Sequence, residues 1–438
     1  MSGIAEILLS MGFQVSGSDL RRGPVSDRLA QLGATIFEGH EAGHVVGATV
    51  VVTSSAVPPN NPEVLEARAR KIPVIQRAEM LAELMRLKYG IAIAGMHGKT
   101  TTTSMVAAVL GAGGLDPTVV VGGRVDALGS NAKLGSTQYL VAEADESDRS
   151  FLKLSPILAV VTNLDREHMD CYRDMDDVEQ AFLSFMDKVP FYGAVTACID
   201  NAALAAILPK VHRRVFTYGV TPNADYRLDL LGSEPGSYSR FQVSTATASL
   251  GPFELHVPGR HNVLNAAAAV AIADQLEVAP DRIAEGLKSF RGVDRRFQVR
   301  GRARGVTVVD DYGHHPTEIR ATLAAARECR PRRIHVVFQP HRFTRTRDLL
   351  DEFGGAFTEA DSVTVLPIYA ASEEPLPGIT SELLTSKITS PGAQFAPDFS
   401  CAVASIVGEA REGDMVMTLG AGSVSQIGPQ ILAALEGK

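Results

Sequence analysis

GIAIAGMHGKTTTTSMVAAVLGAG, residues 90–113, is the stretch that decides the fold class of this chain. An apolar run at 91–94 leads into Gly95-Met96-His97-Gly98-Lys99-Thr100, and a helical pattern follows from Thr101. A strand, a glycine-rich loop and a helix in this order are typical of a phosphate-binding loop. Glycines let main-chain N–H groups and the helix N-terminus face an anion, while Lys99 reaches the outer phosphates and the Thr100 hydroxyl suits the accompanying Mg²⁺.

The spacing of this loop differs from the common one. The pattern G-x-x-x-x-G-K-[ST] would place a glycine at position 93, where this chain has Ile93. The loop is therefore the shorter G-x-x-G-K-T. A glycine turn before an ordinary helix remains the alternative for this stretch taken alone.

Length and composition predict a large, compact protein. At about 150 residues per domain, 438 residues suggest about three domains. The apolar fraction of 45% and the charged fraction of 21% favour packed cores over disorder. A net charge of −8 gives no overall basic field for nucleic acid or anionic lipid. The four cysteines stand far apart, which indicates reduced thiols without a disulfide framework or a cysteine metal site.

The chain has no stretch that predicts membrane insertion. Its most apolar helix-like run, 266–273, is far shorter than the roughly 20 residues that span a bilayer. The beginning of the sequence does not have the pattern of a signal peptide. We therefore expect a cytoplasmic protein.

Residues before the phosphate loop predict a small α/β domain. Helices are expected from residue 2 to Gly12, over 62–70 and over 78–87, and strands over 13–19, 49–55 (buried) and 73–75. Doubly wound domains normally begin with a strand and a glycine-rich turn. A helix in first place therefore suggests that the first element of this domain is missing.

The remainder of the chain predicts two further α/β units. Strands over 91–94, 118–121, 139–143, 157–162 and 194–199, with a helix at 178–188, indicate a parallel sheet buried on both faces. Residues 226–257 predict a few antiparallel strands, followed by helices over 262–276 and 280–289. In the last unit, strands over 306–310, 334–338, 363–366 and 415–419 alternate with helices over 317–329, 347–357 and 401–410. The predicted domains are 1–88, 89–297 and 298–438.

Polar side chains follow several of these strands. Strand 139–143 leads into Glu143-Ala144-Asp145-Glu146-Ser147-Asp148, whose four carboxylates suit Mg²⁺ beside a phosphate loop. A solvated acidic loop is the alternative. Strand 157–162 is followed by Asn163, Asp165, His168 and Asp170, expected at the same sheet edge, although a lone histidine is more often a cap or a packing residue than a ligand.

Amide and basic motifs occur later in the chain. Asn262 and Asn265 could bind a base, but Asn262 is equally well explained as a helix N-cap. The 291–297 segment carries arginines that suit a phosphate tail, with solvated linker charge as the alternative. The runs 310–316 and 339–347 each follow a strand, and the second contains three arginines suited to carboxylate or phosphate. Caps and exposed charge are the alternative for each motif separately.

Seven motifs together resemble a known family. In chain order they are GMHGKTTT, EADESD, TNLDREHMD, PGRHNVLNAAAA, GVDRRFQ, DDYGHHPTE and FQPHRFTRTRDL. They resemble the Mur ligases of peptidoglycan synthesis, most of all the members that use L-alanine, over nearly the whole chain. The resemblance implies an N-terminal Rossmann-like domain that binds a UDP-sugar, a central ATPase domain, and a C-terminal Rossmann-like domain that closes over the site.

The resemblance also implies a reaction. L-alanine would be joined to the carboxylate of UDP-N-acetylmuramate through an acyl phosphate, with ATP and Mg²⁺ as cofactors. Nucleic acid and membrane would not be partners, and the protein would be a monomer or homodimer. Two other functions stay open: a sister ligase that attaches a peptide to the same sugar, and a nucleotide-controlled binding protein that hydrolyses ATP without ligation.

Site residues are transferred motif by motif. The resemblance implies an ATP site of Gly95, Met96, His97, Gly98, Lys99, Thr100, Thr101, Asn163, Asn262, Asn265 and Asp311. Within it, Lys99 would hold the phosphates, the amides would lie near adenine and Asp311 on the ribose. Thr100 and Glu143 would bind one Mg²⁺ and His168 a second. Arg296 would act at the γ-phosphate. The muramoyl substrate or acyl phosphate would be contacted by His341, Arg342 and Arg345, with His314 and His315 as further contributors.

The start of the chain departs from the family pattern. Family members carry a strand and a G-I-G-G-I-G turn just before a segment that resembles residues 1–6. We therefore expect weakened UDP-sugar binding and a less stable first domain.

Overall fold

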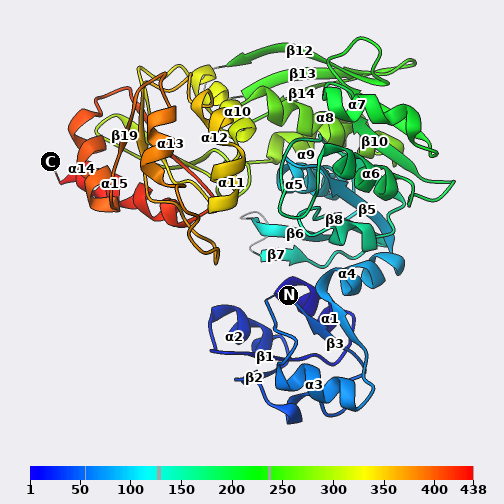
Figure 1. Ribbon diagram of the computed structural model, residues 1–438. Helices are drawn as coiled ribbons and strands as arrows, with labels where there is room; N and C mark the ends of the chain where they lie inside the picture. Colours follow the sequence, from blue (N-terminus) through cyan, green and yellow to red (C-terminus); the bar gives the residue numbers. More distant parts are fainter. Residues whose placement is uncertain (55, 126–129, 235–237, 438) are drawn as a thin grey trace. The chain divides into compact units, whose positions relative to one another are not determined.

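The computed structural model describes residues 1–54, 56–125, 130–234 and 238–437 (Figure 1). Contacts divide the chain into two compact units. The first consists of Met1–Leu164, Val178–Tyr218 and Ala268–Gly286, and the second of Asp165–Asp177, Gly219–Ala267 and Leu287–Lys438. Both are built from strands that alternate with helices, which confirms the predicted α/β class. Among the described residues, no helix has both the length and the apolarity needed to cross a membrane.

The first unit begins with short elements. They are α1 (Ser2–Ser10), β1 (Ser16–Asp19), α2 (Pro24–Gln31), β2 (Thr35–Glu38), β3 (Val51–Thr53), α3 (Pro62–Ala69), β4 (Val74–Gln76) and α4 (Arg77–Arg86). Strand β1 pairs in parallel with β2, and β3 with β4. The predicted burial of strand 49–55 is wrong, because β3 lies in a sheet of two strands and stays partly exposed. Ser55, the last residue of that prediction, lies outside the described residues.

A larger sheet follows in the same unit (Figure 1). Neighbouring strands run in the order β11-β10-β9-β5-β8-β6-β7, all parallel except β7, which is antiparallel to β6. Their bounds are β5 (Tyr89–Ala94), β6 (Thr118–Val125), β7 (Ser130–Lys133), β8 (Tyr139–Glu143), β9 (Leu158–Val161), β10 (Ala194–Cys198) and β11 (Val215–Gly219). Residues 91–94 of β5 are completely buried, which confirms the predicted sheet with two covered faces.

The position of β5 determines where a ligand can bind. It lies between β8 and β9, so the carboxyl ends of these three strands meet at one edge. Helix α5 (Lys99–Ala112) follows β5 after the loop at 95–98, and α6 (Met175–Met186) follows β9. In open α/β sheets this edge, at a reversal of strand order, is where ligands bind.

The second unit contains antiparallel strands and a further sheet. Strands β12 (Tyr226–Glu234), β13 (Tyr238–Ser244) and β14 (Ser249–Leu255) are antiparallel, as predicted, and α8 (Arg260–Gln275) and α9 (Pro280–Ser289) come next along the chain. The following sheet has the order β15-β16-β20-β17-β18-β19. Its strands are β15 (Gln298–Ala303), β16 (Val306–Asp311), β17 (Ile334–Phe338), β18 (Ser362–Val365), β19 (Ala393–Phe395) and β20 (Met415–Leu419).

Helices and side chains form two cores around this last sheet. One contains apolar side chains of α10 (Pro316–Glu328), α12 (Leu350–Gly354) and α13 (Ser381–Lys387). The other contains those of α14 (Phe399–Glu409) and α15 (Ile427–Glu436). Because both faces are covered, the functional side chains of this unit lie at strand ends rather than on a sheet face.

One predicted helix is wrong. The pattern over 347–357 corresponds to α11 (Phe343–Asp348) and α12, separated at Leu349, where the backbone leaves helical geometry with φ −119° and ψ 20°. Leu349 and Phe353 are both buried in the same core. The break therefore lets Arg345 and Arg347 of α11 stay outside this apolar core while the chain continues into it.

Candidate active site

The phosphate loop lies in the first unit, between β5 and α5. Gly95 has a φ of +131°, and a Cβ at this position would collide with the hydroxyl oxygen of Thr162. Gly98 has a φ of +81° and forms the N-cap of α5. Gly95 is required for both its backbone conformation and the lack of space for a Cβ, and Gly98 for its backbone conformation. The short G-x-x-G spacing is thus fixed by this turn.

Asn163, at the end of β9, holds the shape of the loop. Its Oδ1 accepts from His97 N at 2.9 Å and its Nδ2 donates to His97 O at 3.0 Å. Its main-chain oxygen accepts from Met96 N at 3.3 Å. The N–H groups of Met96 and His97 therefore face Asn163, contrary to the expectation that consecutive loop N–H groups face an anion. The donors suited to an anion are those of the first turn of α5, which a helix leaves without intrahelical acceptors.

Lys99 and Thr100 each contact a different glutamate. Lys99 Nζ donates to Glu146 Oε1 at 2.7 Å, and also to the carbonyls of Gly95 at 2.8 Å and Met96 at 3.1 Å. Thr100 Oγ1 donates to Glu143 Oε2 at 3.0 Å. A hydroxyl and a carboxylate this close offer the hard oxygen ligands that Mg²⁺ prefers, so Thr100 and Glu143 fit the implied ion.

The four carboxylates after β8 do not form one cluster. Asp145 Oδ1 accepts from Ser147 N at 3.0 Å and Ser147 Oγ at 2.7 Å, and Asp148 Oδ1 accepts from Ser150 N at 2.9 Å. These two aspartates shape the loop after the strand. Of the four, Glu143 and Glu146 are the ones bonded to Thr100 and Lys99. The predicted single acidic cluster is therefore corrected to two separate pairs and two loop-forming side chains.

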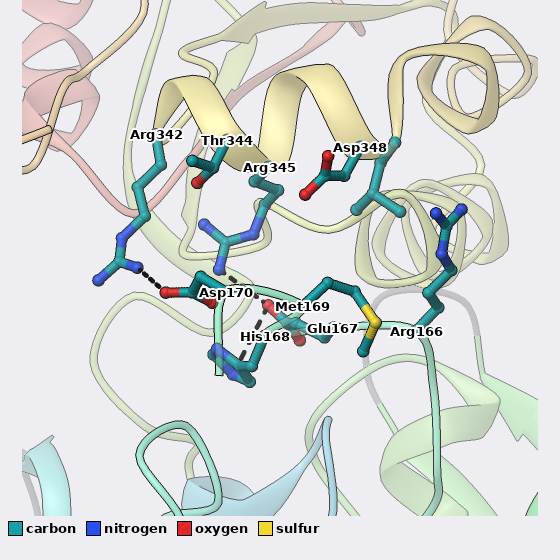
Figure 2. Close-up of a pocket in the computed structure, with 10 residues that line it drawn as sticks. Arg166, Glu167, His168, Met169, Asp170, Arg342, Thr344, Arg345 and Asp348 are labelled. Atoms are coloured by element: carbon teal, nitrogen blue, oxygen red, sulfur yellow. Dashed lines mark hydrogen bonds and ion pairs between the residues drawn. The ribbon is translucent and has the colours of Figure 1, made fainter. Parts of the chain in front are cut away.

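A basic cluster lies in the second unit, and we define it as His314, His341, Arg342 and Arg345. Glu167, 4% exposed, is a carboxylate at its centre. Its Oε1 lies 3.1 Å from Arg345 Nη2, 3.4 Å from His314 Nε2 and 4.0 Å from His168 Nε2. Arg342 pairs with Asp170 at 3.0 Å. Glu167, His168, Asp170, Arg342 and Arg345 also line a pocket. Figure 2 draws its lining residues, which are Arg166, Glu167, His168, Met169, Asp170, Arg342, Thr344, Arg345, Asp348 and Leu349.

His341 is neutral in this cluster. Arg345 Nη1 lies 3.1 Å from His341 Nδ1, and because a guanidinium only donates, Nδ1 must accept. The remaining proton is therefore on Nε2. Burial, together with the charges of His314, Arg345 and Arg342, lowers the pKa of His341 to about 3. The ring also stacks on Tyr369, with centroids 5.6 Å apart.

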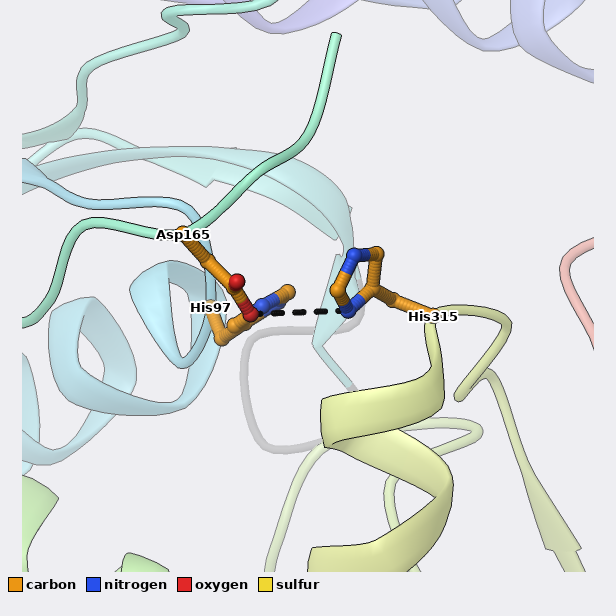
Figure 3. A group of neighbouring side chains, drawn as sticks. All are labelled: His97, Asp165 and His315. Carbon is orange, nitrogen blue, oxygen red and sulfur yellow. Dashed lines mark ion pairs between the residues drawn. The ribbon is translucent and has the colours of Figure 1, made fainter. Parts of the chain in front are cut away.

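His315 has a structural position. Its Nδ1 accepts from Thr317 N at 3.2 Å and caps α10, so Nε2 carries the proton that faces Arg166 O at 3.2 Å. Asp165 Oδ2 lies 3.5 Å from Nδ1 (Figure 3). His315 thus joins the start of α10 to the segment that begins at Asp165.

The other candidates of this unit make local bonds. Arg296 lies 3.2 Å from Glu318 and 5.1 Å from the Tyr312 ring. Asp311 accepts from Phe297 N and Gly313 N, both at 2.7 Å, and burial raises the pKa of its carboxyl. The bonds of Asp311 fix the backbone just before β15 and the turn after β16.

The two predicted amides lie in the first turns of α8. Asn262 Nδ2 donates to Pro258 O at 2.7 Å, and Asn265 Nδ2 lies 3.5 Å from Asn262 Oδ1. Because α8 begins at Arg260, the alternative of Asn262 as the N-cap is wrong. Both residues are buried, and the amide nitrogen of each donates to a neighbour in this turn.

Comparison with known proteins identifies the family. Residues 1–89 match the Mur ligase family catalytic domain, residues 93–273 the Mur ligase middle domain, and residues 295–422 the Mur ligase glutamate ligase domain. The chain belongs to the Mur ligase family. A UDP-N-acetylmuramate–L-alanine ligase of Acidobacterium capsulatum is 67% identical over 438 residues, which cover 100% of this chain and 96% of the relative. One of Koribacter versatilis is 61% identical, with 100% and 95% covered.

Solved Mur ligase structures share the fold. The UDP-N-acetylmuramate–alanine ligase of Thermotoga maritima has a TM-score of 0.80 at 29% identity, with 100% of this chain and 96% of that chain covered. A murein peptide ligase of Psychrobacter arcticus has a TM-score of 0.69 at 25% identity, with 100% and 97% covered.

Two glutamates were left out of the transferred Mur ligase residues. Glu146 bonds Lys99, and Glu167 faces Arg345 and His314. The sequence signal for Glu146 was its place in the acidic run after a buried strand. The sequence signal for Glu167 was an acidic residue next to His168, in a chain whose later motifs contain many basic residues that need a counter-charge.

Proposed function

We propose that this chain is an ATP-dependent ligase that joins L-alanine to the carboxylate of UDP-N-acetylmuramate in peptidoglycan synthesis. The observation that carries the proposal is full-length similarity, at 67% identity, to a relative with that name. We further propose that residues 1–88 bind the UDP-sugar, 89–297 bind ATP and 298–438 supply the basic cluster, in a cytoplasmic monomer or homodimer.

Such a ligase has to activate a carboxylate. A free carboxylate is a poor acyl donor, so its oxygen first attacks the γ-phosphorus of ATP, and ADP leaves. The amine of L-alanine then attacks the acyl carbon, and the tetrahedral intermediate expels phosphate as the amide forms. The protein's contribution is to position these groups and to stabilise the charge that moves between them.

The phosphate loop suits the first half of this reaction. Lys99 and the first turn of α5 would hold the phosphate chain. Thr100 and Glu143 would hold one Mg²⁺ and His168 a second, and the bound ions would neutralise phosphate charge. Asn262 and Asn265 would lie near adenine. Asp311 would contact the ribose through Oδ2, which accepts one main-chain N–H and has a lone pair left.

The basic cluster suits anionic groups of the substrate and intermediate. Arg342 and Arg345 present planar guanidinium groups that match a carboxylate or an acyl phosphate. His341 would donate through Nε2, because Arg345 occupies Nδ1. Arg296 would neutralise the γ-phosphate.

The deciding experiment measures phosphate release from ATP with each substrate omitted in turn. Release that needs both UDP-N-acetylmuramate and L-alanine is expected, together with an amide-linked product detected by mass spectrometry. Release without either substrate would instead identify a nucleotide-controlled binding protein that hydrolyses ATP.

A second candidate function is peptide attachment to the same sugar. The murein peptide ligase of similar fold is the observation that favours testing it. L-alanine and the peptide L-alanyl-γ-D-glutamyl-meso-diaminopimelate, compared as acceptors under identical conditions, separate the two. We expect a higher kcat/KM with L-alanine, and a preference for the peptide would reverse the assignment.

A further inference from the structure

The ammonium group of Lys99 is surrounded by acceptors from its own unit. It donates to Gly95 O at 2.8 Å, to Met96 O at 3.1 Å and to Glu146 Oε1 at 2.7 Å. A lysine ammonium carries three hydrogens. These bonds use all three, so a phosphate oxygen that Lys99 contacts must replace or share one of the acceptors.

Glu146 is the acceptor suited to exchange. The carbonyls of Gly95 and Met96 belong to the loop itself, whose backbone is bonded to Asn163 through Met96 N. The Glu146 carboxylate instead belongs to a side chain, which can change rotamer without moving the loop backbone, and it carries the same sign of charge as a phosphate. A phosphate oxygen therefore competes with this carboxylate more readily than with either carbonyl.

The burial of Lys99 and Glu146 strengthens the bond with which a phosphate must compete. The side chain of Lys99 is 14% exposed and that of Glu146 is 1% exposed. Water and salt screen such a pair little, and a charge-assisted bond of 2.7 Å is among the stronger hydrogen bonds in proteins. Removing the cation from a buried carboxylate carries a desolvation penalty that the new contact must overcome.

A second glutamate on the same segment has a different partner. Glu143 accepts from Thr100 Oγ1 at 3.0 Å and from Gly122 N at 2.9 Å. The two glutamates, three residues apart, thus hold the neighbouring Lys99 and Thr100 separately. Glu143 matches the proposed metal ligand set, whereas Glu146 contacts the phosphate-binding cation.

We propose that Glu146 is a positioning residue for Lys99 that competes with the outer phosphates of ATP for the ammonium and thereby sets the affinity for nucleotide. The inference rests on the ATP site of the proposed function. Glu146 holds Lys99 at the loop, and ATP binding transfers one ammonium hydrogen from the carboxylate to a phosphate oxygen. Part of the binding free energy of ATP is spent on this exchange.

The test is the affinity of the full-length chain for ATP with Mg²⁺, measured by titration calorimetry without the other substrates. Glu146→Gln keeps the shape of the side chain and removes its charge, so Lys99 transfers more easily and the Kd for ATP should fall about three- to tenfold. The matched control is Asp148→Asn, whose side chain bonds Ser150 N in the same segment. Its Kd should stay within about twofold of the wild type. A merely structural role of Glu146 predicts weaker binding, the opposite sign.

A Kd for Glu146→Gln that equals or exceeds the wild-type value, with an unchanged melting temperature, would overturn the inference. If Glu146→Gln does not fold, Glu146→Asp decides the question. It keeps the charge but withdraws it by one methylene, so tighter binding supports the competition and equal or weaker binding refutes it. A wild-type chain that does not bind ATP would instead refute the proposed function itself.

Discussion

The phosphate loop and the basic cluster would bind anions through different chemical groups. The loop offers the first N–H groups of α5 and one lysine, and its shape depends on Gly95, Gly98 and the Asn163 bonds to His97. The basic cluster offers imidazole and guanidinium side chains oriented by Glu167. Backbone conformation determines the first site and contacts between distant side chains determine the second. Substitutions that act on the backbone should therefore damage the loop most, and substitutions of counter-charges should damage the cluster.

The largest effect is expected at Lys99, the cationic side chain of the loop. Lys99→Ala removes the cation that would hold the phosphates, and phosphate release should fall at least about 1,000-fold. The control is Lys153→Ala, which removes a lysine that pairs with Glu79 and Gln76 in the same unit. Its activity should stay within about twofold. Activity retained in the Lys99 variant would break the assignment of the loop.

The next prediction tests whether the phosphate loop depends on its backbone conformation. Gly95→Ala forces a Cβ against Thr162 at a positive φ and should lower the free energy of unfolding by about 2–4 kcal/mol. Gly111→Ala is the matched control, because this exposed glycine lies inside α5 with open space around it. This change should raise the free energy of unfolding by up to about 1 kcal/mol. Urea unfolding of both variants gives the comparison. Equal stabilities would show that the loop is not conformationally constrained.

The third prediction tests whether the basic cluster depends on the counter-charge of Glu167. Glu167→Gln removes the charge that orients Arg345 and His314, and kcat/KM for UDP-N-acetylmuramate should fall about 10- to 100-fold while Kd for ATP changes little. Glu352→Gln provides the control, since this exposed carboxylate pairs with Arg166 at 3.2 Å. Its kcat/KM should stay within about twofold. If both variants behave alike, the counter-charge is not what orders the cluster.

The smallest effect concerns the pH dependence of stability, which we expect to depend on a buried histidine of the second unit. Burial, with the charge of Arg296, lowers the pKa of His261 in the second unit to about 4. A histidine whose folded pKa lies below its unfolded value of about 6.5 binds fewer protons when folded. Its contribution is thus complete above pH 6.5 and is lost as the pH falls toward 4.

The measurement is urea unfolding at pH 7 and pH 5. The loss of stability between them should be about 2 kcal/mol smaller in His261→Gln than in the wild type. His212→Gln, at a histidine whose side chain is 80% exposed, should leave the loss unchanged. An unchanged loss in His261→Gln would exclude this histidine as a source of acid sensitivity.

The sequence predicted features encoded locally. The strand, short loop and helix around Gly95 and Lys99 follow from glycine spacing and apolar periodicity, and the structure confirms that order. Strand β15 was missed because Gln298–Ala303, QVRGRA, is an antiparallel edge strand without an apolar pattern. The helix break at Leu349 was missed because it depends on a core that the local pattern does not describe.

The contacts between side chains were harder to predict. Glu167 and Arg345 are 178 positions apart, so no pattern in a single sequence reveals their pairing. In the acidic run after β8 the residues are close in sequence, but their contacts differ. Its four carboxylates look equivalent in sequence, but Asp145 and Asp148 bond the following turn, while Glu143 and Glu146 reach Thr100 and Lys99. Short-range bonding of aspartate to its own backbone is the reason.

The first turn of α5 has a consequence for inhibitor escape. A compound anchored on the N–H groups at residues 99–101 would contact atoms that every amino acid except proline provides. Ordinary substitutions at these positions leave such donors in place. A compound anchored on Arg342 or Arg345 would lose its contact with one codon change. Durable competitors should therefore be directed to the helix start rather than to the guanidinium groups.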